Sequence, residues 1–335
     1  MCRGVHGGHK IFNLRRAVVI KCLSAQLAQD EVEREIATAA ARGRLGFAPT
    51  VTRYSVAQRW YEEDYVLGDP GAVFYGAQNA EFRARFHGEI VRILEQILRI
   101  EPPAPVRLGD YVDGLMSRLK TALERPRRAP GVGALVLKFA AEYLEDDLRA
   151  AADEIVLTAF SHGDLAAGNI LRTNDRAIVI DWEAAGRRSI LFDLYSYLFA
   201  EVHKRRAKTL PAEELDQAMR ALQAKLTREP SRPLDVTRMA DIYRRLFYLE
   251  RLLILAERNV SDKRFSRLVM RTIEVFSQYE TRAADRTPVD GRHDNTKGAG
   301  IHEDTEDRGS KYATTIVVGA LLSLAAEPAL ASVLG

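Results

Sequence analysis

The sequence predicts an α+β protein with two lobes, a small β-rich lobe followed by a larger, mainly helical one. β-type runs fill residues 1–68, helical periodicity dominates residues 69–281, and a short strand–turn–strand unit lies inside the helical half. A chain of 335 residues is also too long for one compact core. We expect a polar, disordered linker at 282–312 and an apolar tail at 313–335.

Composition narrows the class of protein. Hydrophobic residues make up 47% of the chain, which is ordinary for a globular protein, and the formal net charge is only +3. This charge is too small to indicate nucleic acid as a partner. Two cysteines form no disulfide framework, and the N-terminus MCRGVHGGHK lacks the apolar segment of a secretory signal. We therefore expect a cytoplasmic protein.

The N-terminal lobe begins with a predicted hairpin of strands at His9–Leu14 and Ala17–Lys21. Gly7 and Gly8 stand directly before it, where the lack of a Cβ lets backbone N–H groups approach phosphate oxygens. Lys21 ends the second, strongly β-branched strand, from which an ammonium group can reach phosphates. A turn glycine pair and a surface lysine are the alternatives.

A helix is predicted over residues 30–42, where apolar residues recur at spacings of three and four. A carboxylate on its inward face could pair with Lys21, and Glu35 and Glu33 are the candidates. Both glutamates could instead be solvated charges. Residues 51–66 then read as further strands of a five-stranded lobe that ends at a hinge near Gly68.

The second lobe is predicted to be helical apart from a central β unit. Amphipathic helices are expected at 82–100, 108–123, 135–151, 235–258 and from 262 to about 279. A β-rich run at 154–160 leads into the segment SHGDLAAGNILRTNDRAIVIDWE, which holds the main candidates for chemistry.

This segment, Ser161–Glu183, brings together polar side chains of complementary kinds. Two short apolar strands joined by a turn-rich TNDR form a hairpin, which places Asn169 near Asp181. Asp164 lies five residues before Asn169. Amide and carboxylate oxygens suit Mg²⁺, which takes a few protein oxygens and fills its shell with water and phosphate.

The pattern His162-x-Asp164-x4-Asn169, followed by a hairpin and Asp181, resembles the catalytic segment of the kinase-like fold. Gly163, in place of arginine, and the DWE sequence at 181–183 resemble the aminoglycoside phosphotransferase and choline kinase branch. The resemblance covers roughly residues 5–280. It implies ATP as donor and transfer of the γ-phosphate to a hydroxyl of a small molecule, such as a sugar, an amino alcohol or an aminoglycoside.

The resemblance also implies roles for individual residues. Asp164 is the expected base, and Asn169 and Asp181 are expected to hold Mg²⁺ on the ATP phosphates. For His162 a scaffold role is favoured over proton transfer, and Asp193 is expected to brace the loop or, alternatively, to cap a helix.

In the N-terminal lobe, Lys21 would bind the α- and β-phosphates, Glu35 would hold it there, and Gly7 and Gly8 would cover the nucleotide. The family usually has a complete strand before its glycine loop. Only six residues precede Gly7, so we expect this first strand to be clipped or missing.

The only feature of the sequence that bears on the phosphate acceptor is the charge of residues 204–274. Residues 204–274 contain seventeen Lys or Arg against ten Asp or Glu. Because a pocket for a polycationic aminoglycoside should present carboxylates, we expect a neutral or anionic acceptor such as a sugar or a glycan-linked alcohol. A basic surface away from the pocket is the alternative.

The apolar run at 313–326 is shorter than the roughly 20 residues that a membrane span needs. We expect an interfacial or self-packing helix there, with a tail anchor as the alternative.

Two other functions of the whole protein fit the sequence. One is a catalytically silent ATP-binding scaffold, and the other is a membrane-tethered kinase acting on a glycan or a lipid-linked acceptor.

Overall fold

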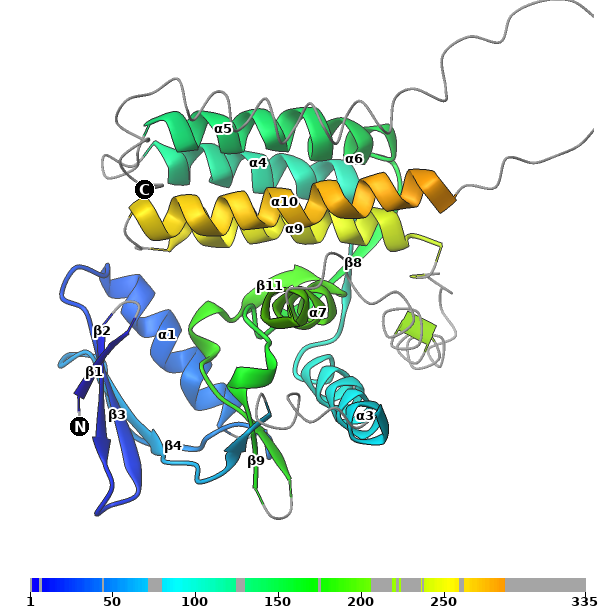
Figure 1. Ribbon diagram of the computed structural model, residues 1–335. Helices are drawn as coiled ribbons and strands as arrows, with labels where there is room; N and C mark the ends of the chain where they lie inside the picture. Colours follow the sequence, from blue (N-terminus) through cyan, green and yellow to red (C-terminus); the bar gives the residue numbers. More distant parts are fainter. Residues whose placement is uncertain are drawn as a thin grey trace, which may run out of the picture.

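The protein has the predicted α+β architecture, with a β-sheet first and helices after it (Figure 1). The computed structural model describes residues 2–5, 8–43, 45–71, 80–124, 130–173, 176–205, 219–220, 223, 236, 238–258 and 262–286. In Figure 1 the N-terminal sheet and its helix, in blue, lie beside the green-to-orange helical part.

An antiparallel five-stranded sheet forms the N-terminal part, in the order β1-β2-β3-β5-β4. Its strands are β1 (Cys2–Val5), β2 (Gly8–Asn13), β3 (Val18–Leu23), β4 (Val51–Ser55) and β5 (Trp60–Asp64). The first strand, expected to be clipped or missing, is present as the four-residue β1. The four residues of β1 pair with β2 from Cys2↔Ile11 to Val5↔Gly8, because the ladder of β2 gives a short segment a complete set of partners.

Helix α1 (Gln29–Arg42) covers this sheet with the predicted apolar stripe. Val32, Ile36 and Ala39 are buried and pack in a cluster with Leu23 of β3. The spacing of these residues sets the rotation of the helix about its axis, which turns Glu35 toward β3.

The helical part is larger and centred on one buried helix. Its helices are α3 (Ala80–Ile97), α4 (Leu108–Leu123), α5 (Pro130–Ala140), the π-helical turn η1 (Ala141–Glu145), α6 (Asp146–Ala150), α7 (Phe192–Arg205), α9 (Ala240–Glu257) and α10 (Asp262–Arg286). Helix α9 contacts α4, α7 and α10, and its Tyr243, Phe247 and Leu252 are fully buried.

Helix boundaries differ from the expected ones mainly in length. α4 has the predicted bounds, whereas the helix expected over 135–151 already starts at Pro130 and contains the π-helical turn. α10 continues to Arg286, past the expected end near Tyr279 and into the segment assigned to the linker.

Two small antiparallel sheets position the loop segments of the helical part. One has the order β10-β9-β6 and the other the order β11-β8-β7. Their strands are β6 (Asp69–Pro70), β7 (Ala104–Arg107), β8 (Ile155–Ser161), β9 (Ile170–Arg172), β10 (Ala177–Val179) and β11 (Gly186–Ser189). β7 and β11 have no strand signal in the sequence. They form as the two edges of β8, whose backbone supplies their partners.

Some expectations lie outside the described residues. These are the loop glycine Gly7, the apolar tail 313–335 and the linker beyond Arg286. Within the part of the chain that the structure describes, no helix combines the length and the apolarity needed to cross a bilayer.

Candidate active site

The segment between β8 and β9 holds three of the predicted site residues, His162, Asp164 and Asn169. Of these, His162 is the buried one. The side chain is completely buried. Its Nε2 lies 2.9 Å from the carbonyl oxygen of Ile180, and its Nδ1 lies 3.2 Å from the amide nitrogen of Asp164. The imidazole therefore links the loop to the end of β10. Burial lowers the pKa of His162 despite the nearby Asp193, so the ring is neutral at physiological pH.

Asp193, at the start of α7, braces the same loop. Its carboxylate accepts hydrogen bonds from the hydroxyl of Ser161 at 3.0 Å, from the amide of His162 at 2.7 Å and from the amide of Gly163 at 2.9 Å. Gly163 has φ +81°, and a Cβ there would come within 2.0 Å of the carbonyl oxygen of Ala184. The bracing contact expected of Asp193 is thus present, and the position of Gly163 admits no side chain.

Asp164 projects from this braced loop into solvent, with 44% of its side chain exposed. One carboxylate oxygen accepts a hydrogen bond from Arg258 at 3.2 Å. Partial burial raises the pKa of Asp164, but Arg258, Arg251 and His162 outweigh it and hold the pKa below its ordinary value. Asp164 is therefore a carboxylate across the physiological range.

The hairpin β9–β10 joins Asn169 to the segment that carries Asp181, as predicted. The amide nitrogen of Ile180 donates to the carbonyl oxygen of Asn169 at 2.8 Å, and the Asn169 side-chain nitrogen donates to the carbonyl oxygen of Asp164 at 2.9 Å. This second bond leaves the side-chain oxygen of Asn169 as its outward ligand atom. Asp181 follows β10 in the left-handed conformation, φ +62°, with 45% of its side chain exposed.

The predicted ion pair between Lys21 and Glu35 is present at 2.9 Å. Burial lowers the pKa of Lys21, but Tyr61, Glu35 and Glu183 outweigh it and hold the pKa above its ordinary value. Glu33, the competing candidate, is exposed on the other side of α1 and accepts a hydrogen bond from Gln29. The apolar stripe of α1 decides between the two glutamates, since it faces the sheet together with Glu35.

Two further residues at this place were missed by sequence reasoning, Lys10 and Glu183. Lys10 pairs with Asp181 and lies 3.5 Å from Glu183, which in turn lies 3.3 Å from Lys21. Lys10 is the cross-strand partner of Lys21 in the β2–β3 ladder. Counting the register back from the hairpin turn would have shown that both lysines lie side by side. Together they join the N-terminal sheet to the end of the hairpin.

Gly8 has a reason of its own to be glycine. It is paired with Leu23 in the β2–β3 ladder, and a Cβ would lie 1.9 Å from the carbonyl oxygen of Cys22. The packing of β2 against β3 is therefore enough to explain a glycine at this position, without any contact to phosphate. Gly7 lies outside the described residues.

The oxygen atoms at the hairpin suit a Mg²⁺ ion that is coordinated partly by the protein and partly by water and phosphate, rather than one enclosed by protein side chains. Among the described residues, no group of three or more His, Cys, Asp or Glu side chains is arranged to hold a metal ion. The candidate set is the Asn169 side-chain oxygen and the half-exposed carboxylate of Asp181. Mg²⁺ commonly takes one or two such protein oxygens and completes its shell with water and phosphate.

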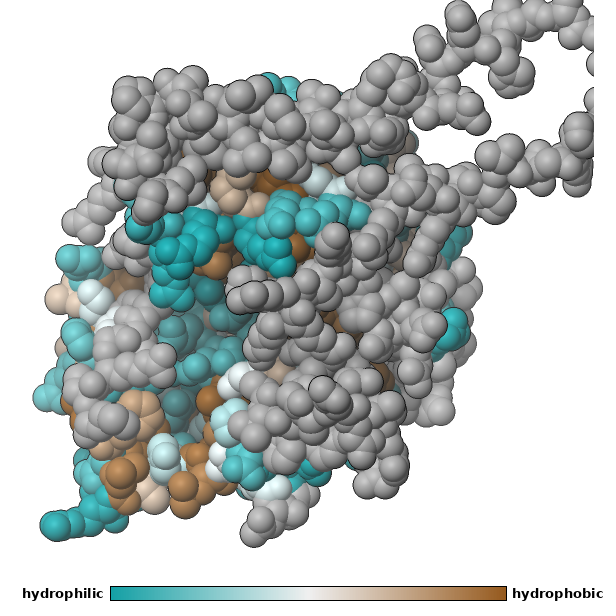
Figure 2. Space-filling model, in the orientation of Figure 1, coloured by the Kyte–Doolittle hydropathy of each residue, from teal (hydrophilic) through white to brown (hydrophobic). Residues whose placement is uncertain are grey.

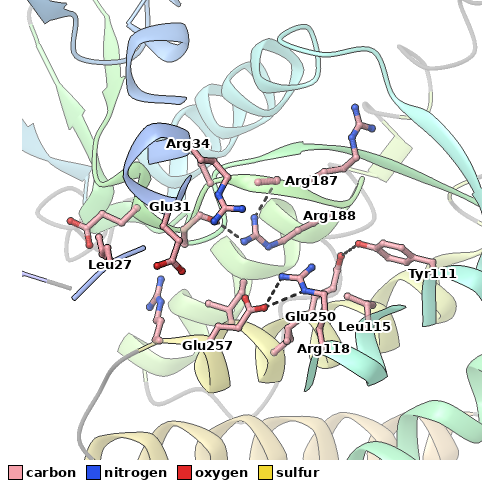
Figure 3. A pocket seen from close by; sticks show the side chains of 17 residues that line it. Leu27, Glu31, Arg34, Tyr111, Leu115, Arg118, Arg187, Arg188, Glu250 and Glu257 are labelled. Carbon is pink, nitrogen blue, oxygen red and sulfur yellow. Dashed lines mark hydrogen bonds and ion pairs between the residues drawn. The ribbon is translucent and has the colours of Figure 1, made fainter. Parts of the chain in front are cut away.

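Two neighbouring cavities open beside these residues. A cavity of about 670 Å³ lies between α1 on one side and α4, α9 and β11 on the other, and its walls include the ion pair of Arg118 with Glu257 and the Tyr111–Glu250 hydrogen bond (Figure 3). A smaller cavity of about 180 Å³ includes Asp164 itself. Both include Arg258. Figure 2 shows that hydrophilic residues gather between the helices and the N-terminal sheet.

Comparison with curated proteins gives no match. Among solved structures, a choline/ethanolamine kinase family protein from Mesorhizobium loti is 14% identical, with a TM-score of 0.45, over 100% of this chain and 90% of that one. The choline kinase LicA from Streptococcus pneumoniae is 11% identical, with a TM-score of 0.44, over 96% and 90%. An aminoglycoside phosphotransferase from Streptomyces rimosus is 20% identical, with a TM-score of 0.47, over 76% and 92%.

A family model covers a continuous stretch of the sequence. The model of the phosphotransferase enzyme family matches residues 13–236, a range that contains Lys21, Asp164, Asn169 and Asp181. This match extends over more than half of the chain, and the protein therefore belongs to the phosphotransferase enzyme family.

Proposed function

We propose that this phosphotransferase transfers the γ-phosphate of ATP to a hydroxyl group of a small molecule. The observation that carries the proposal is the contact between the two halves of the site. Lys10 and Lys21 of the N-terminal sheet form ion pairs with Asp181 and Glu183, and the same hairpin positions the loop of Asp164. Cations for phosphates, oxygens for a metal and the half-exposed carboxylate of Asp164 thus belong to one connected set of elements.

Each residue then has a role that its surroundings support. Asp164, ionised and half-exposed, accepts the proton of the acceptor hydroxyl or orients it, a contribution of about 10²–10⁴ in rate. Lys21, held by Glu35, neutralises phosphate charge. His162 acts as a positioning residue, because both ring nitrogens are engaged with the backbone and the ring is buried.

Asn169 and Asp181 are the proposed ligands of Mg²⁺, which when bound would neutralise charge on the phosphates. Lys10 forms an ion pair with Asp181. Its ammonium group would therefore lie beside the metal and the phosphates and would add positive charge there.

The test measures ADP formation and phosphorylated product by mass spectrometry, with ATP and Mg²⁺ and a panel of alcohols. We expect Asp164→Asn to lower transfer about 10²–10⁴-fold and to leave ATP binding unchanged. Asp153→Asn is the matched control, since Asp153 is exposed and pairs with Arg107 away from the site. A wild-type protein that binds ATP but phosphorylates no member of the panel would support the silent scaffold, and equal activity of wild type and Asp164→Asn would refute the assigned base.

A further inference from the structure

The cavity that includes Asp164 is lined by three arginines. Arg251 lies in the last two turns of α9, and Arg258 is the residue that follows this helix. Arg264 lies in the first turn of α10. Gly163 and apolar side chains complete the lining, and Asp164 is the one carboxylate among these residues. The basic excess noted in the sequence is therefore partly gathered next to the proposed base.

Arg251 shows that this charge is not fully compensated within the described part of the chain. Its guanidinium lies 4.0 Å from the centre of the Phe199 ring, and its Nε is buried without a hydrogen-bond partner among the described residues. Burial lowers the pKa of Arg251 to about 10, so the group is still charged at neutral pH. The carboxylate of Asp164 acts on Arg251 through its charge, but no described acceptor satisfies the buried Nε, and an anion bound in the cavity would supply one.

Arg258 links this cavity to Asp164, the proposed base. It donates to Asp164 at 3.2 Å, so the same carboxylate that should receive the acceptor hydroxyl is paired with a cation. An anion between the arginines would compete for Arg258 and release Asp164 toward the hydroxyl. A cationic acceptor would instead meet three like charges.

We propose that the acceptor is an anionic alcohol, whose carboxylate or phosphate group binds Arg251, Arg258 and Arg264 while its hydroxyl faces Asp164. The proposal rests on the proposed function and specifies its substrate class. Arginine suits this role because its planar fork of donors matches carboxylate and phosphate oxygens.

The experiment compares alcohols that share a skeleton and differ in charge, with ATP, Mg²⁺ and the full-length protein. One series is glycerol, glycerate and glycerol 3-phosphate, and the other is glucose, glucosamine, glucuronate and glucose 6-phosphate. Turnover is followed by product mass, and binding by calorimetry in the presence of ADP and Mg²⁺. We expect kcat/KM, or the binding constant where turnover is slow, to be at least tenfold higher for an anionic member than for its neutral parent.

The arginines are tested by Arg264→Gln, with Arg267→Gln as matched control, since Arg267 is exposed on the same helix and does not line the cavity. Losing one charged hydrogen bond to the anion should raise KM for the anionic acceptor about 10–100-fold, with KM for ATP unchanged. Arg267→Gln should behave as wild type.

Three outcomes would overturn the proposal. They are preference for neutral or cationic members, no binding by any anionic member to a protein that still binds ATP, and equal effects of the two glutamine variants. Failure of the proposed function looks different, because no acceptor of any charge would then be phosphorylated.

Discussion

At the scale of single residues, two buried carboxylates, Asp193 and Glu250, are held by hydrogen bonds from several partners. Asp193 receives three hydrogen bonds from Ser161, His162 and Gly163, and Glu250 receives two from β11. Glu250, 2% exposed, accepts from the amide and hydroxyl of Ser189 and from the hydroxyl of Tyr111. These bonds tie α9, β11 and α4 together beneath the larger cavity.

Glu250 makes stability depend on pH. Burial raises its pKa, and the hydrogen bonds from Ser189 and Tyr111 and the charge of Arg188 do not cancel that effect. A carboxyl whose folded pKa is raised contributes stability that is fully present below its unfolded pKa of about 4.3 and is lost as pH rises through the folded pKa. We expect Glu250→Gln, which stays neutral, to gain stability relative to wild type as pH rises from 4 to 7.

The measurement is urea unfolding of both proteins across this range. The difference in free energy of unfolding between Glu250→Gln and wild type should grow with pH and level off once Glu250 is ionised in the folded state. A difference that does not change with pH would show that the folded protein leaves the pKa of Glu250 unshifted.

At the scale of elements, the loop between β8 and β9 depends on a backbone shape that one glycine permits. Gly163→Ala would force a Cβ to within 2.0 Å of the carbonyl oxygen of Ala184 at φ +81°. We expect a loss of at least about 3 kcal/mol in the free energy of unfolding, from the backbone strain and the overlap together. We also expect about a 10²-fold drop in kcat, because Asp164 would be displaced.

Gly114→Ala on α4 is the matched control for this substitution. Gly114 is an exposed helical residue, and a Cβ there would meet nothing within 4 Å. Alanine should stabilise the helix by about 0.5–1 kcal/mol and leave kcat unchanged. Chemical denaturation and steady-state kinetics on the two variants check both effects, and a Gly163→Ala protein as stable as wild type would contradict the strain argument.

At the scale of the whole molecule, the N-terminal sheet is connected to the hairpin by backbone as well as by charge. The amide of Val179 donates to the carbonyl oxygen of Phe47 at 2.7 Å, and Arg176 donates to the carbonyl oxygen of Gly46 at 3.0 Å. Lys10 and Lys21 add the ion pairs to Asp181 and Glu183. A ligand bound at this junction contacts both parts and should stabilise them together.

ATP with Mg²⁺ should therefore raise the thermal stability of the folded protein. The expected gain is about 2.7 kcal/mol at a ligand concentration of 100 Kd. Removing Mg²⁺ with EDTA should reduce the gain, and Asp181→Ala, which removes the ligand oxygens, should make the gain insensitive to EDTA. Differential scanning calorimetry with ATP, with and without EDTA, measures all three, and an Asp181→Ala protein that keeps the full Mg²⁺ effect would exclude Asp181 as a ligand.

Much of the fold was predictable because its signals are local. The apolar periodicity of α1 and α4 and the β-branched run of β3 each follow from neighbouring residues in the chain. β1, β7 and β11 were not predictable in the same way. Each is four residues long and owes its strand geometry to a partner, β2 for the first and β8 for the other two.

The candidate site also combines features set by neighbouring residues with features set by long-range contacts. By itself, the sequence determined the spacing of His162, Asp164, Asn169 and Asp181, because one loop and one hairpin carry them all. For the partner of Lys21 it favoured Glu35 over Glu33, and the structure shows the Glu35 ion pair. These relations are set by backbone geometry over a few residues.

Only the tertiary structure decided which charges from distant segments surround that motif. Lys10 reaches Asp181 across 171 positions of the chain, and Arg258 reaches Asp164 across 94. The charge count of the sequence could not tell a remote basic surface from a basic cavity, because position in space depends on how α9 and α10 pack. That packing places Arg251, Arg258 and Arg264 beside Asp164, since long-range contacts, unlike periodicity, are a property of the assembled core.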